Sequence, residues 1–203
     1  NEANSGFLRL HLTERRGPGY GLDHLLDTPR QSAEVSFFLE PQEGSFSGRL
    51  NDQLKLSRPL TSQVSLNWQR DSGYGLGSEA LNGNLTLRYD DADSNSLLGF
   101  QQAITRSTYS TSRRFGSSLT HRQQLGRNAE WQLRSTLSSS RYLANQAADQ
   151  ELNLDLSYRR QGGLYDLTAL LQRRYDLDGS AYTGDSSYYA LQRVPDLNLV
   201  SDG

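Results

Sequence analysis

A strict two-residue alternation of apolar and polar side chains constrains the fold of this chain more than any other feature. It is clearest at residues 152–174, which read LNLDLSYRRQGGLYDLTALLQRR. In an extended segment, Leu154 and Leu156 fall on one side and Asp155 on the other. The alternation resumes after a double glycine at 162–163. This stretch therefore predicts a β-hairpin whose strands each have an apolar and a polar face.

The same alternation recurs along the whole chain, and no segment has a sustained helical period. It is clear at 33–39, 64–68, 85–89 and 131–137, and weaker at 6–14, 19–27, 45–56, 96–104, 113–123 and 186–194. No apolar run reaches the ~18–20 residues that a transmembrane helix needs. The sequence predicts a single all-β domain over residues 1–203, with about twelve strands.

The connections between these strands help to decide what the apolar faces meet. A soluble sheet would bury them in a core, whereas a membrane barrel would turn them to lipid. Short turns are expected near 57–61, 91–95, 124–128 and 160–163, and long loops near 71–81, 105–112, 139–149 and 175–185. Short turns at one end and long loops at the other are typical of outer-membrane barrels. We therefore expect an antiparallel up-and-down transmembrane β-barrel, or an open portion of a larger one.

In such a barrel, the polar side of each strand would line the lumen. The alternation places Arg88, Arg134, Asp155 and Asp166 on that side, and we take them as the lumen-facing candidates. Tyrosines near the predicted strand ends agree with this interpretation, because amphipathic rings collect at membrane–water interfaces.

Composition argues against several other functions. The formal net charge is −2, which gives no basis for nucleic-acid binding, and the absence of cysteine excludes disulfide and thiolate chemistry. The histidines, His11, His24 and His121, fit no metal-binding spacing. His11 and His24 fall on neighbouring predicted strands and are candidates to face one another. We expect neither an enzyme nor a cofactor or metal site.

Three stretches resemble the barrel of a known family, the lipopolysaccharide-assembly protein LptD, also called organic solvent tolerance protein. They are SSYYALQRVPDLNLVSD at 186–202, FLRLHLTERRGPGYGLDHLL at 7–26 and QRDSGYGLGSEAL at 69–81. The first resembles a family segment in which an aromatic residue precedes a Leu/Val-Pro-x-Leu strand entry. The second resembles the family's first barrel strands, and the third its first long loops.

This resemblance implies a large barrel in the outer membrane of a diderm bacterium that inserts lipopolysaccharide, or a related glycolipid, into the outer leaflet. The family's barrel receives the lipid from a periplasmic LptA-like bridge, is plugged by the lipoprotein LptE and opens at a lateral seam between its first and last strands. Prolines in the first strands loosen that seam, so Pro18 and Pro29 are the seam candidates here. With no separate periplasmic domain evident, the resemblance leads us to expect an N-terminal portion of an LptD-like barrel.

Two other functions remain open from the sequence. A general porin or structural barrel of about twelve strands would also fill 203 residues. A soluble, secreted β-rich binding module would carry the same binary pattern. Dependence on detergent separates the module from both barrels.

Overall fold

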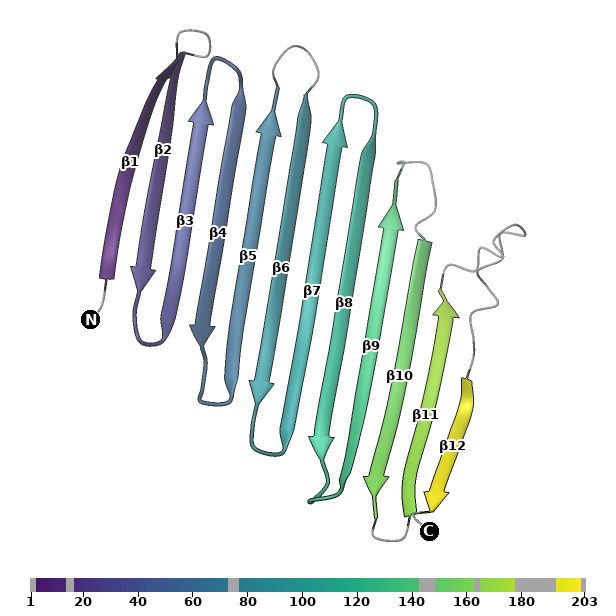
Figure 1. The fold of residues 1–203 in the computed structure, drawn as a ribbon. Coiled ribbons are helices and arrows are strands. Elements are labelled where there is room, and N and C mark those ends of the chain that lie inside the picture. The colour runs from purple at the N-terminus through teal and green to yellow at the C-terminus, as the bar shows by residue number, and fades with distance from the viewer. Residues whose placement is uncertain are drawn as a thin grey trace.

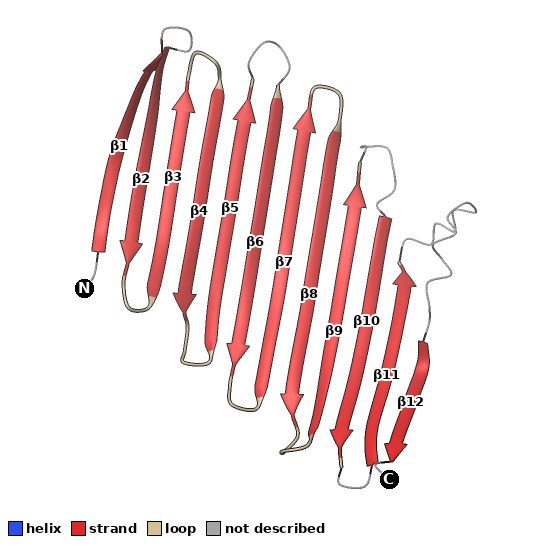
Figure 2. Cartoon of the chain, in the orientation of Figure 1, coloured by secondary structure: helices blue, strands red, loops and turns tan. Residues whose placement is uncertain are grey.

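The computed structural model describes residues 3–13, 17–72, 77–142, 149–162, 165–177 and 193–201. They form one antiparallel sheet of twelve strands in which the order along the chain is the order in the sheet (Figure 1). The strands are β1 (Ala3–Thr13), β2 (Gly17–Asp27), β3 (Gln31–Glu40), β4 (Ser45–Lys55), β5 (Leu60–Asp71), β6 (Ser78–Asp90), β7 (Ser94–Ser107), β8 (Thr111–Gln124), β9 (Ala129–Arg141), β10 (Asp149–Gln161), β11 (Tyr165–Asp176) and β12 (Arg193–Ser201). The described part contains strands, turns and loops only (Figure 2). The all-β up-and-down prediction is therefore confirmed.

The predicted last strand, 186–194, falls mostly outside the described residues, so it stays a prediction. The described strand begins at Arg193, and residues 178–192 lie outside the described part. The alternation that pairs with β11 is Leu197-Asn198-Leu199, with Leu197 opposite Ala169 and Leu199 opposite Leu167. Apolar side chains that face one another across the ladder therefore fix the register of β12 against β11.

The connections confirm most of the predicted alternation in length. At one end of the sheet they span 28–30, 56–59, 91–93, 125–128 and 162–164, and at the other 14–16, 41–44, 72–77, 108–110, 142–148 and 177–192. We call these the short-turn end and the long-loop end. The predicted long loop at 105–112 is wrong, because Arg106 and Thr111 still pair and Ser107 closes a tight turn onto Ser110.

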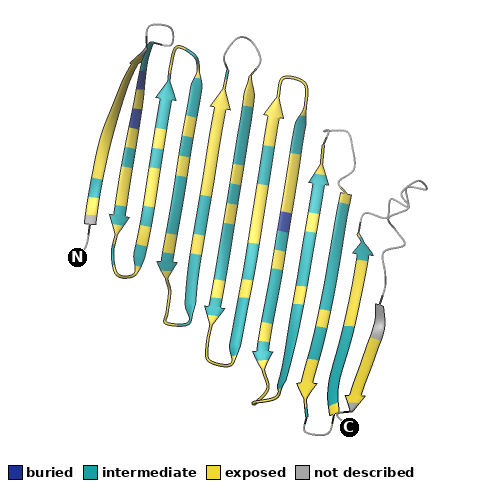
Figure 3. Cartoon of the chain, viewed as in Figure 1, coloured by how far each residue is buried: buried dark blue, intermediate teal, exposed yellow. Residues whose placement is uncertain are grey.

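The sheet is a single layer without a core. No hydrophobic side chain is buried in the described part, and Leu8, Leu10 and Leu12 are each more than 80% exposed. Figure 3 shows that nearly every described residue is exposed or half-buried. The accessible surface is 15017 Å², whereas a compact protein of this mass would expose about 9,600 Å². The apolar side of this layer therefore needs a cover from outside the sheet.

The sheet is open. β1 pairs only with β2, and β12 only with β11, so these two strands are its edges. The predicted closure into a barrel is not present in this arrangement, and the coarser prediction of an up-and-down sheet of about twelve strands is what the structure confirms.

The strands are staggered in one direction across the whole sheet, as the descending strand ends in Figure 1 show. One row of directly paired residues runs Asn4, Leu26, Ala33, Asp52, Val64, Leu85, Phe100, Ser117, Leu137, Leu152 and Tyr175. Asn4 lies one residue beyond the start of β1 and Tyr175 ten residues beyond the start of β11, so the row climbs nine residues over ten strand-to-strand steps. With ~3.3 Å per residue and ~4.8 Å between strands, this corresponds to a tilt of about 32°. That value lies just below the ~35–45° of closed barrels.

Candidate functional site

The register assigns every strand residue to one of two faces. Residues that pair directly across a ladder lie on the same face, and so do residues two apart along a strand. Starting from Leu154 and applying these rules through all eleven ladders defines an apolar face, which contains the row from Asn4 to Tyr175. The other side we call the polar face.

Leucine separates cleanly between the two faces. Of the 27 leucines in the described strands, 24 lie on the apolar face, and only Leu25, Leu97 and Leu170 lie on the polar one. The main polar intrusion near the middle of the apolar face is Asp52, whose Oδ1 accepts a 2.9 Å hydrogen bond from Gln31 Nε2 of the same face. The predicted hairpin faces are thus confirmed and extend over the whole sheet.

Aromatic side chains form two belts on the apolar face. Near the short-turn end lie Tyr89, Trp131, Tyr158 and Tyr165, and towards the long-loop end lie Tyr20, Phe46, Trp68, Phe115 and Tyr175. Phe46 packs edge-on against Trp68 with ring centroids 4.5 Å apart, and against Phe37 at 4.7 Å. Every Tyr and Trp in the described strands lies on this face, so the rings follow the apolar surface and its two borders.

The polar face carries the four residues predicted from the sequence. Arg134 lies directly opposite Asp155, and Arg88 and Asp166 are on the same face nearer the short-turn end. The Arg88 guanidinium forms an ion pair with Asp90 at 2.8 Å, and Asp166 Oδ1 accepts a 3.3 Å bond from the Gly162 amide. The structure therefore brings these residues to one surface, although they do not form one cluster.

Ion pairs concentrate on the polar face. Arg9 pairs with Asp23 in a bidentate contact, and the other pairs on this face are Arg88–Asp90, Arg122–Glu130 and Arg174–Glu151. Among the ion pairs of the described residues, only Arg106–Glu79 lies on the apolar face. Since these side chains are exposed or partly exposed, each pair contributes little to stability. They mark this face as one that meets water.

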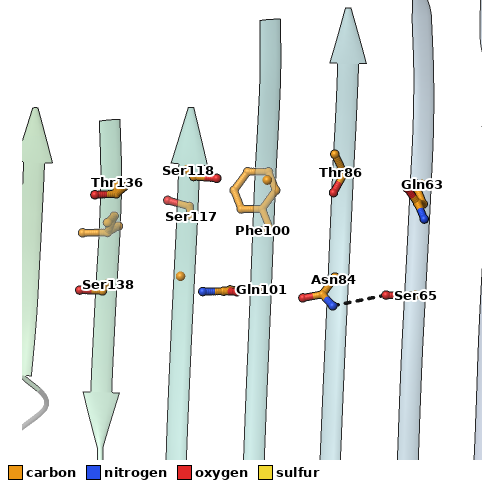
Figure 4. A pocket seen from close by; sticks show the side chains of 13 residues that line it. Gln63, Ser65, Asn84, Thr86, Phe100, Gln101, Ser117, Ser118, Thr136 and Ser138 are labelled. Atoms are coloured by element: carbon orange, nitrogen blue, oxygen red, sulfur yellow. Dashed lines mark hydrogen bonds between the residues drawn. The ribbon is translucent and has the colours of Figure 1, made fainter. Parts of the chain in front are cut away.

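A shallow depression of about 450 Å³ lies in the middle of the polar face. Its floor is low because Gly99 and Gly116 carry no side chain, and Ser65, Asn84 and Gln101 stand around it (Figure 4). Asn84 Nδ2 donates a 3.4 Å hydrogen bond to Ser65 Oγ. No charged side chain lines this depression; its polar side chains are hydroxyls and amides, and Phe100 and Leu137 also line it.

Phe38 is the clearest aromatic exception on the polar face, and two glycines explain it. A Cβ at Gly19 would lie 2.6 Å from the Phe38 ring, and one at Gly21 would lie 2.9 Å from it and 3.0 Å from the Phe37 carbonyl. The Phe38 ring therefore covers the backbone of these glycines and takes the place of the side chains that they lack. Sequence alternation alone gave no sign of this contact.

The two seam candidates lie close to an edge of the sheet. Pro18 is the second residue of β2 and pairs with Leu12 of the edge strand β1. The β2–β3 ladder starts only at Tyr20, so Pro18 faces a partner on the β1 side alone. Pro29 lies in the turn between β2 and β3 rather than in a strand. Their predicted role at a seam stays a prediction.

The histidines do not assemble. His11 lies on the polar face opposite Gly19, and His24 on the apolar face opposite Val35, so the idea that they face one another is wrong. His121 Nδ1 lies 2.7 Å from Ser96 Oγ, a contact that no sequence spacing suggested. Its ring also packs at 4.7 Å against Trp131. Because this Ser–His pair sits in an aromatic belt and no contact of the described residues adds a carboxylate to it, we assign it a packing role.

Within the described residues, no three His, Asp or Glu side chains converge as metal ligands, and no helix is long and apolar enough to cross a membrane. Comparison with known proteins found no matching family, no similar curated protein and no similar solved structure.

Proposed function

We propose that this chain forms the wall of an outer-membrane β-barrel of the LptD type, which moves lipopolysaccharide or a related glycolipid into the outer leaflet. The observation that carries the membrane part is the one-layer sheet whose apolar face is bordered by two aromatic belts. A soluble sheet of this size would need a second layer over that face. Lipid is a cover that requires no further protein.

The dimensions of the apolar face support this proposal. On β11 the two belts are marked by Tyr165 and Tyr175, ten residues apart. That spacing spans about 33 Å along a strand, or about 28 Å across a bilayer at a tilt of about 32°. Outer-membrane barrels have an apolar band of about 25 Å between aromatic girdles.

The polar face supports a water-filled interior. Barrel lumens tolerate charged and amide side chains because they remain hydrated, and this face carries four ion pairs and an uncharged polar depression. The glycolipid, the LptE plug and the LptA-like bridge come from the sequence resemblance. Lumen-facing roles for Arg88, Arg134, Asp155 and Asp166 complete the proposal.

Refolding tests the membrane part. We expect the chain to fold only with detergent or lipid, and the folded form to migrate differently on a gel before and after boiling. The physical reason is that the exposed apolar face would aggregate in water. A monomer that folds in buffer without detergent would instead support the secreted binding module.

Cross-linking tests the glycolipid part. A photoreactive residue at Asp155 is expected to capture lipopolysaccharide in cells, because a transported lipid must pass the polar face. The same residue at Leu154, one position along on the apolar face, serves as the positive control, since it should capture bilayer lipid in any barrel. Capture at Leu154 without capture at Asp155 would favour a porin or structural barrel.

A further inference from the structure

Charged residues on the apolar face gather at its long-loop end. A stripe runs over five strands, β5 to β9, and consists of Arg70, Glu79, Arg106, Arg113 and Arg141; we call it the rim stripe. Arg70, Glu79 and Arg106 pair directly across β5, β6 and β7. Arg113 pairs with Arg141, and it lies two residues along β8 from the Thr111 that faces Arg106. The members are thus neighbours on one surface.

The rim stripe has an excess of positive charge. Its single carboxylate, Glu79, is already shared, because Oε2 lies 3.7 Å from Arg106 Nη1 and Oε1 accepts a 3.1 Å bond from Trp68 Nε1. Among the described residues, no carboxylate forms an ion pair with Arg70, Arg113 or Arg141. The rim stripe therefore contains four guanidinium groups and one carboxylate.

The pairing of Arg113 with Arg141 is unfavourable without a ligand. Directly opposed residues have Cβ atoms about 4.5–5.5 Å apart, and like charges in such positions destabilise a sheet. The neighbouring Arg114 does not add to this repulsion at close range, because it points to the polar face and lies over the Tyr142 ring at 5.5 Å. An anion between Arg113 and Arg141 would reverse the sign of this interaction.

The two ends of the apolar face differ in charge. At the long-loop end, Arg173 on β11 adds a further cation outside the stripe, lying over Tyr175 at 4.8 Å. At the short-turn end, Arg160 is the only arginine on this face of the described strands. The positive charge of the apolar face therefore lies at the long-loop end, and an anionic ligand of this face would bind there.

We propose that the rim stripe binds the phosphate groups of lipid head groups in the leaflet at the long-loop end, with Arg113 and Arg141 gripping one phosphate together. This inference rests on the proposed function, since it needs the apolar face to meet lipid. Guanidinium groups bind phosphate in charge-assisted, bidentate contacts. The aromatic belt just inside the stripe sets the depth at which a head group would lie.

Tryptophan quenching in phosphatidylcholine vesicles with a small fraction of bromine-labelled phosphatidic acid tests this proposal. The first reporter is a tryptophan introduced by Phe115→Trp, two residues from Arg113 on the same face. In this variant Trp68→Phe and Trp131→Phe remove the two native tryptophans, so that only position 115 fluoresces. The second is native Trp131 in the short-turn belt, with Trp68→Phe. Two arginines at ~1 kcal/mol each predict about thirtyfold stronger association of phosphatidic acid at position 115 than at 131.

The double variant Arg113→Gln/Arg141→Gln is expected to abolish this preference. The matched control, Arg114→Gln/Arg134→Gln, removes two charges from the polar face of the same strands and should retain it. Equal quenching at both positions, a preference unchanged in the first variant, or a preference removed by millimolar inorganic phosphate would overturn lipid head-group binding. If bromine-labelled phosphatidylcholine quenches neither reporter, the apolar face does not meet lipid. That result would contradict the proposed function itself, and not only the binding of head groups.

Discussion

Replacing Leu85 with arginine is expected to destabilise the membrane-inserted chain by about 2–4 kcal/mol, the cost of arginine at the midplane of a barrel's lipid face. Leu85 lies in the middle of the apolar face, between Val64 and Phe100. The matched change, Thr86→Arg, puts the same side chain on the polar face, where Gly99 opposite leaves room for it. We expect a cost within about 0.5 kcal/mol there, as for other surface substitutions.

Urea unfolding of both variants in phosphatidylcholine vesicles measures this difference. Because the two positions are adjacent, they share strand, depth and backbone environment, and differ only in the face that they present. Equal losses in the two variants would show that the faces do not meet different solvents. A larger loss for Thr86→Arg would mean that the polar face, rather than the apolar one, meets lipid.

The strand pattern could be predicted because alternation is a local property of the backbone. Leu154 and Asp155 point to opposite sides of any extended strand, and the ladder to β9 only had to match like with like, Leu156 opposite Leu133 and Tyr158 opposite Trp131. Local pattern and pairing agree nearly everywhere, which is expected of a sequence that specifies one register.

The features that the sequence did not predict depend on contacts between residues far apart in the chain, or on hydrogen bonds within a single turn. Phe38, which the alternation places on the polar face, covers Gly19 and Gly21 of the neighbouring strand. The connection near 108–110 is short because Ser107 and Ser110 bond to each other through their hydroxyls at 2.9 Å. The rim stripe arises only when the register places Arg113 against Arg141. None of these contacts leaves a local signature.

The solvent of each face was also beyond the reach of alternation, since a soluble sheet and a membrane barrel share one binary pattern. Leu8, Leu10 and Leu12 lie on an edge strand with more than 80% of their surface exposed, which supports the proposed membrane wall. On the other edge, Leu197 is 70% and Leu199 64% exposed. Exposed apolar edges of this length are an aggregation hazard in water.

The second large effect concerns those edges. When the 203-residue chain is inserted alone into a bilayer, we expect β1 and β12 to pair with each other. Unpaired backbone groups cost several kcal/mol each in hydrocarbon, so a spanning sheet must close. An even strand number makes β1 and β12 antiparallel, and the observed climb of nine residues over ten steps extrapolates to a shear of about 10–12 for a closed barrel.

An even shear of about 10 or 12 places Leu8 opposite Leu197 or Leu199, since apolar-face residues must pair with apolar-face residues. The chain contains no cysteine, so Leu8→Cys can be combined with Leu197→Cys or Leu199→Cys without side reactions. One of these pairs should form a disulfide in nearly all folded molecules, because directly opposed residues match disulfide geometry. Asn198→Cys is the control, since it points to the polar face. Cross-linking in neither test pair would mean that β1 and β12 are not neighbours, and that the barrel wall of the proposed function needs strands beyond these twelve.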